Sequence, residues 1–147
     1  MNTVSKAKVF IVEDHPQMRE GLRKLVEYEA DFQVCGEAVD VRGAVEGILD
    51  SRPDVAIIDL ELGRQTGLDV IQELGRRSRQ VPVLILSMHS ETLYAESSLH
   101  KGAQGYVMKS ATPDEITYAL RCVLDGNIYL SSGMRQRLSL KKEGNHE

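Results

Sequence analysis

The sequence has 147 residues, of which 27% are charged and 41% hydrophobic, and its formal net charge is −4. These values are typical of one globular domain and argue against long intrinsic disorder. No stretch reaches the roughly 18–20 apolar residues of a membrane span, and residues 1–8 lack the apolar core of a secretory signal. The acidic balance argues against a domain that binds nucleic acid over its whole surface.

Two cysteines, Cys35 and Cys122, lie far apart in the sequence and beside apolar residues. Their number and spacing indicate neither a disulfide framework nor a zinc site. We expect two reduced, mostly buried thiols, which is typical of a cytoplasmic protein.

Five short apolar runs alternate along the chain with five segments of helical periodicity. The runs are rich in Val and Ile with little polar alternation, which is typical of strands buried on both faces of a parallel sheet. They predict strands at residues 8–12, 32–38, 55–59, 81–87 and 105–108. Apolar residues at helical spacing predict helices around residues 18–26, 41–49, 68–74, 93–97 and 116–123.

Residues that cap helices support this alternation. Residues 112–115 (TPDE) form a capping box with Pro at the first helical position. In the fourth helix, the residues expected to face the sheet are Leu93 and Ser97. The other expected N-caps are Asp40, Thr66 and Ser90.

The strict alternation predicts an α/β fold, because parallel strands need crossovers of about a dozen or more residues and helices supply them. Such units wind right-handed and place helices on both faces of the sheet. The pattern fades from about residue 133. We therefore expect one domain at residues 1–132 and a linker or C-terminal tail at residues 133–147, where a short helix on its own would be marginal.

Polar residues stand at the carboxyl ends of four predicted strands. Glu13 and Asp14 follow the first strand, and Asp59 ends the third. Ser87 ends the fourth, and Lys109 follows the fifth. In open α/β sheets these ends share one edge, where ligands bind. Each residue alone has an ordinary explanation as a turn residue or a solvated charge, but their joint placement favours a functional site.

The residue types suit phosphoryl transfer. Three clustered carboxylates repel one another and favour a bound cation, and Mg²⁺ is a hard ion that prefers carboxylate and phosphate oxygens. Asp59 follows four apolar residues, which predicts a deeply placed nucleophile that forms an acyl phosphate. Lys109 and the metal would neutralise the phosphoryl oxygens, and Ser87 would donate a hydrogen bond to one of them.

Four segments form a specific combination: VFIVEDHPQMREGLRKLV, VAIIDLELGRQTGLDVI, VLILSMHS and KGAQGYVMKSATPDEI. With them the chain resembles the receiver domain of two-component response regulators, and more closely the NarL/FixJ (LuxR-type) group, over about residues 8–132. The resemblance implies a flavodoxin-like (βα)5 three-layer sandwich, with a five-stranded parallel sheet of order 2-1-3-4-5.

The resemblance also implies a Mg²⁺ site. Asp59 is the phosphoacceptor and a metal ligand, and Asp14 is the more direct ligand of the acidic pair. Glu13 acts in the acidic pocket through water, and Glu61 supplies a backbone carbonyl to the metal.

Three further residues match the residues that hold and sense the phosphoryl group in the family. Ser87 and Lys109 contact that group, and Tyr106 is the switch aromatic, which turns inward as Ser87 moves toward the phosphate. His15 and His89 flank the site, where we expect them at the rim.

By the same resemblance, the protein is a phosphoacceptor switch and not an enzyme, apart from autocatalytic uptake and hydrolysis of the phosphoryl group. A sensor histidine kinase would be the donor. A homodimer would form through helix 4, strand 5 and helix 5, or through helices 1 and 5. The implied output is transcription, through a DNA-binding domain absent from this chain; the alternative is a stand-alone receiver that acts by protein–protein contacts.

The chain departs from the family in the loop after Asp59. Leu62-Gly63-Arg64 stands where the family usually has Met-Pro-Gly. Gly63 gives the loop more conformational freedom, and Arg64 adds a charge near the acidic site. Asp59 and Gly67 keep their places, so the chemistry is expected to survive.

Three other functions fit less well. A hydrolase of the haloacid-dehalogenase type would need a second Asp two residues after the nucleophile, where this chain has Glu61. A flavodoxin-like cofactor binder would need a phosphate-binding loop after the first strand, where residues 13–16 (EDHP) would repel a phosphate. The intact site residues argue against a pseudo-receiver that serves only as an interaction module.

Overall fold

The computed structural model describes residues 5–131, 133–136 and 138. Most of the expected tail, residues 139–147, lies outside the described residues, as do residues 1–4, 132 and 137. In the described part, five parallel strands form one sheet of order β2-β1-β3-β6-β7, which in chain order is the predicted 2-1-3-4-5. The strands are β1 (Ala7–Val12), β2 (Phe32–Ala38), β3 (Val55–Asp59), β6 (Val83–Ser87) and β7 (Gly105–Met108).

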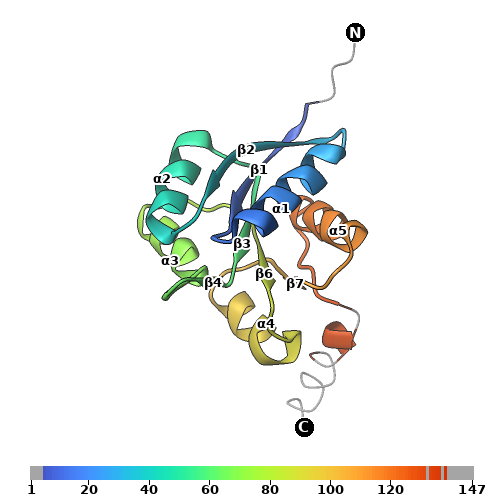
Figure 1. The fold of residues 1–147 in the computed structure, drawn as a ribbon. Coiled ribbons are helices and arrows are strands. Elements are labelled where there is room, and N and C mark those ends of the chain that lie inside the picture. Colours follow the sequence, from blue (N-terminus) through green and yellow to red (C-terminus); the bar gives the residue numbers. More distant parts are fainter. Residues whose placement is uncertain (1–4, 132, 137, 139–147) are drawn as a thin grey trace.

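Helices cover both faces of this sheet (Figure 1). Alternate residues of β1 face opposite sides, so Phe10 belongs to the buried cluster shared with α2, α3 and α4, while Ile11 belongs to the cluster shared with α1 and α5. The predicted α/β fold with two packed layers of helices is therefore confirmed. The helices are α1 (Pro16–Tyr28), α2 (Val41–Ser51), α3 (Leu68–Arg76), α4 (Glu91–His100) and α5 (Pro113–Leu124).

Side-chain caps begin three of the helices as predicted. The side chains of Asp40, Ser90 and Thr112 accept backbone N–H hydrogen bonds at the starts of α2, α4 and α5. The expectation for Thr66 was wrong, because α3 begins at Leu68 with Gly67 in the capping position. Thr66 instead belongs to a short strand, although its hydroxyl still accepts the N–H of Leu68 at 3.3 Å.

A small hairpin follows β3, where we had expected a loop. Its strands, β4 (Glu61–Leu62) and β5 (Gln65–Thr66), are antiparallel and joined by Gly63 and Arg64. Gly63 has φ +62°, a left-handed conformation that glycine adopts without strain, so this departure from the family loop forms a tight turn. Two-residue strands are too short to show a periodic pattern in the sequence.

Helix α4 turns a different face to the sheet from the one expected. Leu93 is 70% exposed and Ser97 is exposed as well, while Ala95 and Ser98 are buried. The Ser98 hydroxyl donates to the carbonyl of Tyr94 at 2.8 Å, so its burial leaves no unsatisfied donor. Small side chains thus pack against the sheet, and the large apolar one points to solvent.

Other expectations concern the thiols and the membrane. Cys35 and Cys122 are free and only partly buried.

Within the described residues, no helix combines the length and the apolar character needed to cross a membrane.

Candidate functional site

Residues far apart in the sequence meet at the carboxyl edge of the sheet. Asp59 and Ser87 end the neighbouring strands β3 and β6, while Glu13 and Lys109 follow β1 and β7. Lys109 Nζ lies 2.8 Å from Asp59 Oδ2 and 2.9 Å from Glu13 Oε1. Because both carboxylates are buried, this ammonium is their principal counter-charge.

The electrostatics of this centre are unbalanced toward negative charge. Burial, and then the hydrogen bond and charge of Asp59, raise the pKa of Glu13 to about 8, against the smaller opposing effect of Lys109. Burial alone would lower the pKa of Lys109, but its hydrogen bonds to Asp59 and Glu13 outweigh burial and raise that pKa. A further cation would therefore relieve repulsion among the carboxylates.

The donor atoms fit a hard divalent cation. One ligand atom each from Glu13, Asp14, His15 and Asp59 lies within 4.8 Å of the others. Glu13 Oε2 and Asp14 Oδ1 are buried, and among the described residues neither accepts a hydrogen bond. Carboxylate oxygens are the ligands that Mg²⁺ prefers, so the residues fit the predicted metal.

His15 and Glu61 border this donor set. His15 is 67% exposed, as expected at the rim, yet its Nδ1 lies 3.2 Å from Asp14 Oδ1. The backbone N–H of Glu61 donates to Asp59 Oδ1 at 3.1 Å, which fixes the carboxylate. The metal-binding role of the Glu61 carbonyl stays a prediction.

The position of Asp59 depends on a close approach of Gly67. A Cβ atom on Gly67 would lie 2.2 Å from the backbone oxygen of Asp59 and 2.7 Å from a methyl group of Ile58. The Gly67 N–H donates to the carbonyl of Leu60 at 2.8 Å, which closes the hairpin onto β3. Only glycine fits here without moving the end of β3.

Ser87 and Tyr106 are joined through the loop between β6 and α4. Ser87 Oγ accepts the N–H of His89 at 2.9 Å, and Tyr106 Oη donates to the carbonyl of His89 at 2.9 Å. Tyr106 is fully buried, so its ring occupies the inward position that the resemblance associates with the switch. Burial is also the main reason that the pKa of Tyr106 is raised.

A side-chain pair that sequence reasoning missed lies beside this loop. The imidazole of His89 contacts the carboxylate of Glu61, and its ring centroid lies 4.8 Å from that of Tyr94. With Arg64, these residues line a cleft of about 420 Å³ next to the hairpin. Both residues were named from the sequence, but their contact depends on the hairpin, which left no sequence signal.

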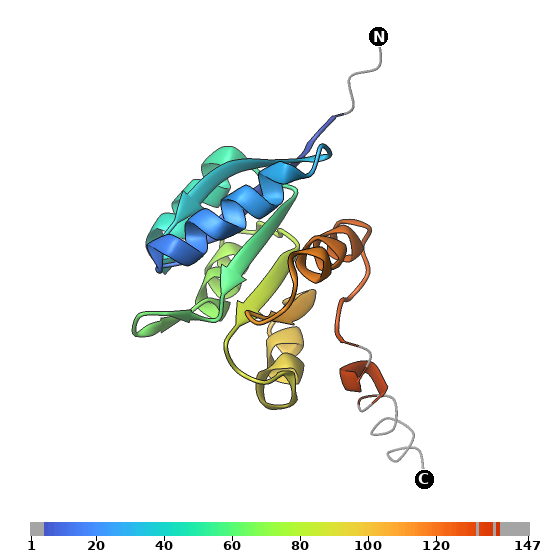
Figure 2. The ribbon, with the colours of Figure 1, turned by 45° about the vertical axis from the view of Figure 1, so that its right-hand side comes forward.

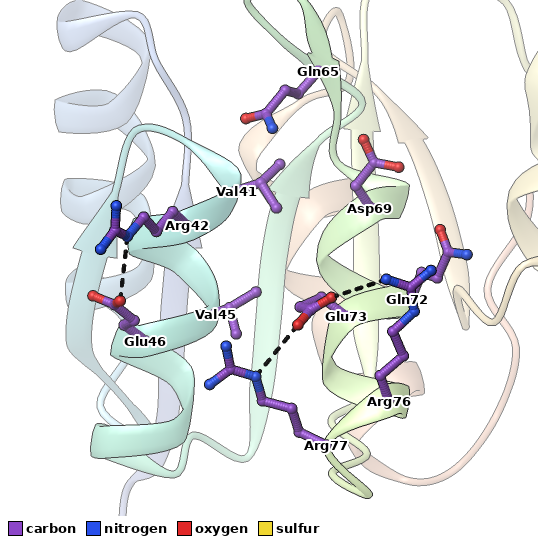
Figure 3. Close-up of a pocket in the computed structure, with 10 residues that line it drawn as sticks. All are labelled: Val41, Arg42, Val45, Glu46, Gln65, Asp69, Gln72, Glu73, Arg76 and Arg77. Atoms are coloured by element: carbon purple, nitrogen blue, oxygen red, sulfur yellow. Dashed lines mark hydrogen bonds and ion pairs between the residues drawn. The ribbon is translucent and has the colours of Figure 1, made fainter.

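A second groove, of about 520 Å³, lies between α2 and α3 (Figure 3). Its charged side chains balance in number, since three arginines face the carboxylates of Glu46, Glu73 and Asp69. Arg42 pairs with Glu46, and Arg76 and Arg77 both pair with Glu73. Exposed pairs of this kind contribute little and leave no unbalanced charge for a ligand. The sheet edge, with its cluster of buried carboxylates, is therefore the stronger candidate.

Comparisons with known proteins agree with this geometry. Residues 9–121 match the response regulator receiver domain family. The chain is 30% identical over 134 residues to the response regulator UvrY of Escherichia coli K12, a match that covers 91% of this chain and 62% of UvrY. It is 31% identical over 126 residues to the transcriptional regulatory protein DegU of Brevibacillus brevis, covering 86% of this chain and 53% of DegU.

Solved structures show the same fold. A LuxR-family two-component response regulator from Aurantimonas sp. SI85-9A1 superposes with a TM-score of 0.86 at 30% identity, covering 94% of this chain and 99% of that one. The signal receiver domain of NarL from Mycobacterium tuberculosis gives a TM-score of 0.79 at 31% identity, covering 84% and 99%. The chain spans less than two thirds of the length of UvrY and DegU.

Proposed function

Because the chain belongs to the response-regulator receiver domain family, we propose that it is a phosphoryl-accepting switch, with Asp59 as acceptor and a sensor histidine kinase as donor. The observation that carries this proposal is the ammonium of Lys109 between the buried carboxylates of Asp59 and Glu13. Such a centre suits a cation and a phosphoryl group together, because it offers excess negative charge to the first and an ammonium to the second.

We propose Mg²⁺ as the cation, held by the carboxylates of Asp14 and Asp59 and by the backbone carbonyl of Glu61, with Glu13 acting through water. The buried oxygens Glu13 Oε2 and Asp14 Oδ1, which accept no hydrogen bond within the described part of the chain, support this assignment. When bound, the ion supplies positive charge that stabilises the phosphoryl oxygens.

The protein residues have complementary tasks in the transfer. A carboxylate oxygen of Asp59 attacks the phosphorus of a phosphohistidine, and the bond from phosphorus to the imidazole nitrogen breaks as the new P–O bond forms. The imidazole keeps the electron pair of the broken bond. Lys109 neutralises phosphoryl oxygens, and Ser87 has a hydroxyl proton to donate because its Oγ accepts the His89 N–H.

Water later hydrolyses the acyl phosphate, so the protein is proposed to be a switch and not an enzyme acting on other molecules. Its setting would be the cytoplasm, where thiols such as Cys35 and Cys122 stay reduced. Its output would be transcription, as the names of DegU and the LuxR-family relatives suggest, through a DNA-binding domain outside these 147 residues. The alternative is a stand-alone receiver that acts by protein contacts.

Either of two surfaces would support a homodimer, α4–β7–α5 or α1 with α5. Exposed apolar side chains lie on both: Leu93 on α4, and Tyr28 and Tyr118 on α1 and α5. No direct contact of this domain with nucleic acid is proposed.

The test is phosphorylation by a small-molecule donor. With Mg²⁺ and acetyl phosphate or phosphoramidate, intact-mass measurement should show one acid-labile phosphoryl group on the wild type. Asp59→Asn should reduce uptake to background, whereas Asp50→Asn, an exposed change on α2, should leave it unchanged. Uptake by Asp59→Asn at the wild-type rate would remove Asp59 from the proposal, and sustained turnover of a small phosphate ester would favour a hydrolase.

A further inference from the structure

The chain after α5 returns to the free edge of the sheet. The N–H of Tyr129 donates to the carbonyl of Gln104 at 2.9 Å, and the carbonyl of Tyr129 accepts the N–H of Tyr106 at 3.1 Å. Tyr129 thereby pairs in parallel with Gly105 of β7, which is the last strand of the sheet. The phenol of Tyr129 donates to Glu115 of α5 at 2.9 Å, so this residue is fixed from two sides.

The residues that follow form a short helix beside α4 (Figure 2). Ser131 begins it, since its hydroxyl accepts the N–H of Met134 at 3.3 Å. The N–H of Ser131 donates in turn to Glu91 in the first turn of α4 at 3.0 Å. We name the described residues 129–131, 133–136 and 138 the C-terminal segment.

Apolar contacts seat the C-terminal segment against the core. Leu130 and Met134 are 3% and 5% exposed, and both belong to the buried cluster that contains Tyr106 and Ala95 of α4. A helix of this length is marginal when isolated, so burial of Met134 and Leu130 must stabilise it.

One chain of hydrogen bonds runs from this segment to Ser87 at the candidate phosphorylation site, and one further hydrogen bond joins the segment to the start of α4. In the first connection, the Tyr106 N–H donates to the carbonyl of Tyr129, and the Tyr106 hydroxyl donates to the carbonyl of His89. The His89 N–H then donates to the Ser87 hydroxyl. The second joins the N–H of Ser131 to Glu91. His89 and Glu91 stand on either side of Ser90, the N-cap of α4, so both connections meet at the start of that helix.

We propose that the C-terminal segment docks on the α4–β7 surface and holds Tyr106 in its inward position, so that docking and occupancy of the phosphorylation site favour each other. Leu130 and Met134 share the buried cluster of Tyr106, and the Tyr106 N–H on the edge strand β7 donates to Tyr129, so a Tyr106 ring that left the interior would lose these apolar neighbours. The coupling rests on the proposed function of Asp59, whereas the docking does not. Coupling between two equilibria is reciprocal, so it can be tested either by releasing the C-terminal segment or by occupying the phosphorylation site.

Amide hydrogen exchange of the full chain tests the docking. Met134→Asp places a charge at a buried position and should release the segment. Exchange of the Tyr106 and Ser131 N–H groups should then accelerate by roughly tenfold or more, because each has lost its acceptor. Gln136→Asp adds the same charge to the same segment at an exposed position and should leave both rates unchanged.

A second variant keeps this test independent of the buried change. Glu91→Ala removes the acceptor of the Ser131 N–H and should accelerate exchange at Ser131 by a factor of about three to ten. Wild-type exchange rates at Tyr106 and Ser131 in both Met134→Asp and Glu91→Ala would overturn the docking.

Beryllofluoride with Mg²⁺, a mimic of an acyl phosphate, tests the coupling. In the wild type it should slow exchange of the Tyr106 N–H, and in Met134→Asp it should bind about fivefold to tenfold more weakly than in wild type or Gln136→Asp. Equal affinity in all three proteins would overturn the coupling and leave the docking intact. Failure of the wild type to bind beryllofluoride would instead contradict the proposed function of Asp59.

Discussion

Two ion clusters in this molecule have the same charges but differ in burial. Each places one cation between two carboxylates, with Lys109 at the carboxyl edge of the sheet and Arg121 on α5. The Lys109 cluster contains the buried carboxylates of Glu13 and Asp59, and among the residues that the structure describes Glu13 Oε2 has no hydrogen-bond partner. The difference shows how environment, more than residue type, separates a chemical centre from a structural ion pair.

The Arg121 cluster is only partly exposed to solvent, and Arg121 contacts both of its carboxylates. Arg121 contacts Asp31 at 3.0 Å and Glu29 at 3.1 Å, and its guanidinium lies 4.9 Å from the ring centroid of Phe32. The hydrogen bond from Arg121 is the main cause that lowers the pKa of Asp31. The pKa of Glu13 shifts in the opposite direction, because burial outweighs the hydrogen bond from Lys109 there, whereas at Asp31 the hydrogen bond from Arg121 outweighs burial.

The largest effect is expected from breaking the buried cluster. Lys109→Ala leaves Glu13 and Asp59 buried without their counter-charge, which should lower the free energy of unfolding by about 3 kcal/mol at pH 8 without metal. Added Mg²⁺ should recover more of the stability in this variant than in wild type. Urea unfolding in EDTA and in Mg²⁺ measures both effects. If Lys109→Ala lost less free energy of unfolding than Arg121→Ala, the proposed difference between the two clusters would be contradicted.

The next effect concerns the backbone that positions Asp59. Gly67→Ala would place a Cβ 2.2 Å from the Asp59 carbonyl oxygen, so β3 must shift, at a cost of about 2–3 kcal/mol. Phosphoryl uptake from acetyl phosphate should also fall in Gly67→Ala, because the shift moves Asp59. Gly75→Ala, a change in α3 with open space around it, is the matched control and should stabilise the protein by about 0.5–1 kcal/mol. Equal unfolding midpoints for the two variants would show that the close approach does not matter.

The two clusters should also respond to pH in opposite directions. Between about pH 4.5 and 8 the folded protein keeps a proton on Glu13 that the unfolded chain has released. The free energy of unfolding of the metal-free protein should therefore fall as pH rises through this window, by about 1 kcal/mol or more. Glu13→Gln removes the titrating group. If the free energy of unfolding of this variant fell with pH as steeply as that of the wild type, another residue would be responsible for the pH dependence.

The smallest effect is expected at the exposed cluster. Arg121→Ala should lower the free energy of unfolding by about 1 kcal/mol or less, because exposed ion pairs are screened by solvent. The contribution of Asp31 is present above its ordinary pKa of 3.8 and is lost as pH falls through its lowered folded value. Unfolding measured at low and high salt should show that the stability lost in Arg121→Ala becomes smaller as salt is added. This loss should not depend on Mg²⁺. Recovery of the lost stability by Mg²⁺ would contradict a purely structural role.

Much of the fold could be predicted because its signals are local. Buried strands such as Val55–Asp59 and Gly105–Met108 have the same bounds in the structure as in the sequence-based prediction. The errors arose where local signals are weak. Thr66 has the residue type of a cap, but it lies in the short strand β5 of the hairpin. Helix α4 buries Ala95 in place of Leu93, and no periodic pattern marked that face in the sequence.

The sequence by itself determined which chemical groups reach the carboxyl edge of the sheet, because a parallel strand delivers the residue after it to that edge. The tertiary structure alone decided what those groups do to one another. Lys109 meets Glu13 and Asp59 across 96 and 50 residues of chain, and Met134 becomes buried only because β7 and α4 present a surface for it. Burial and pKa depend on neighbours brought together by folding, and these long-range contacts have no counterpart in local periodicity.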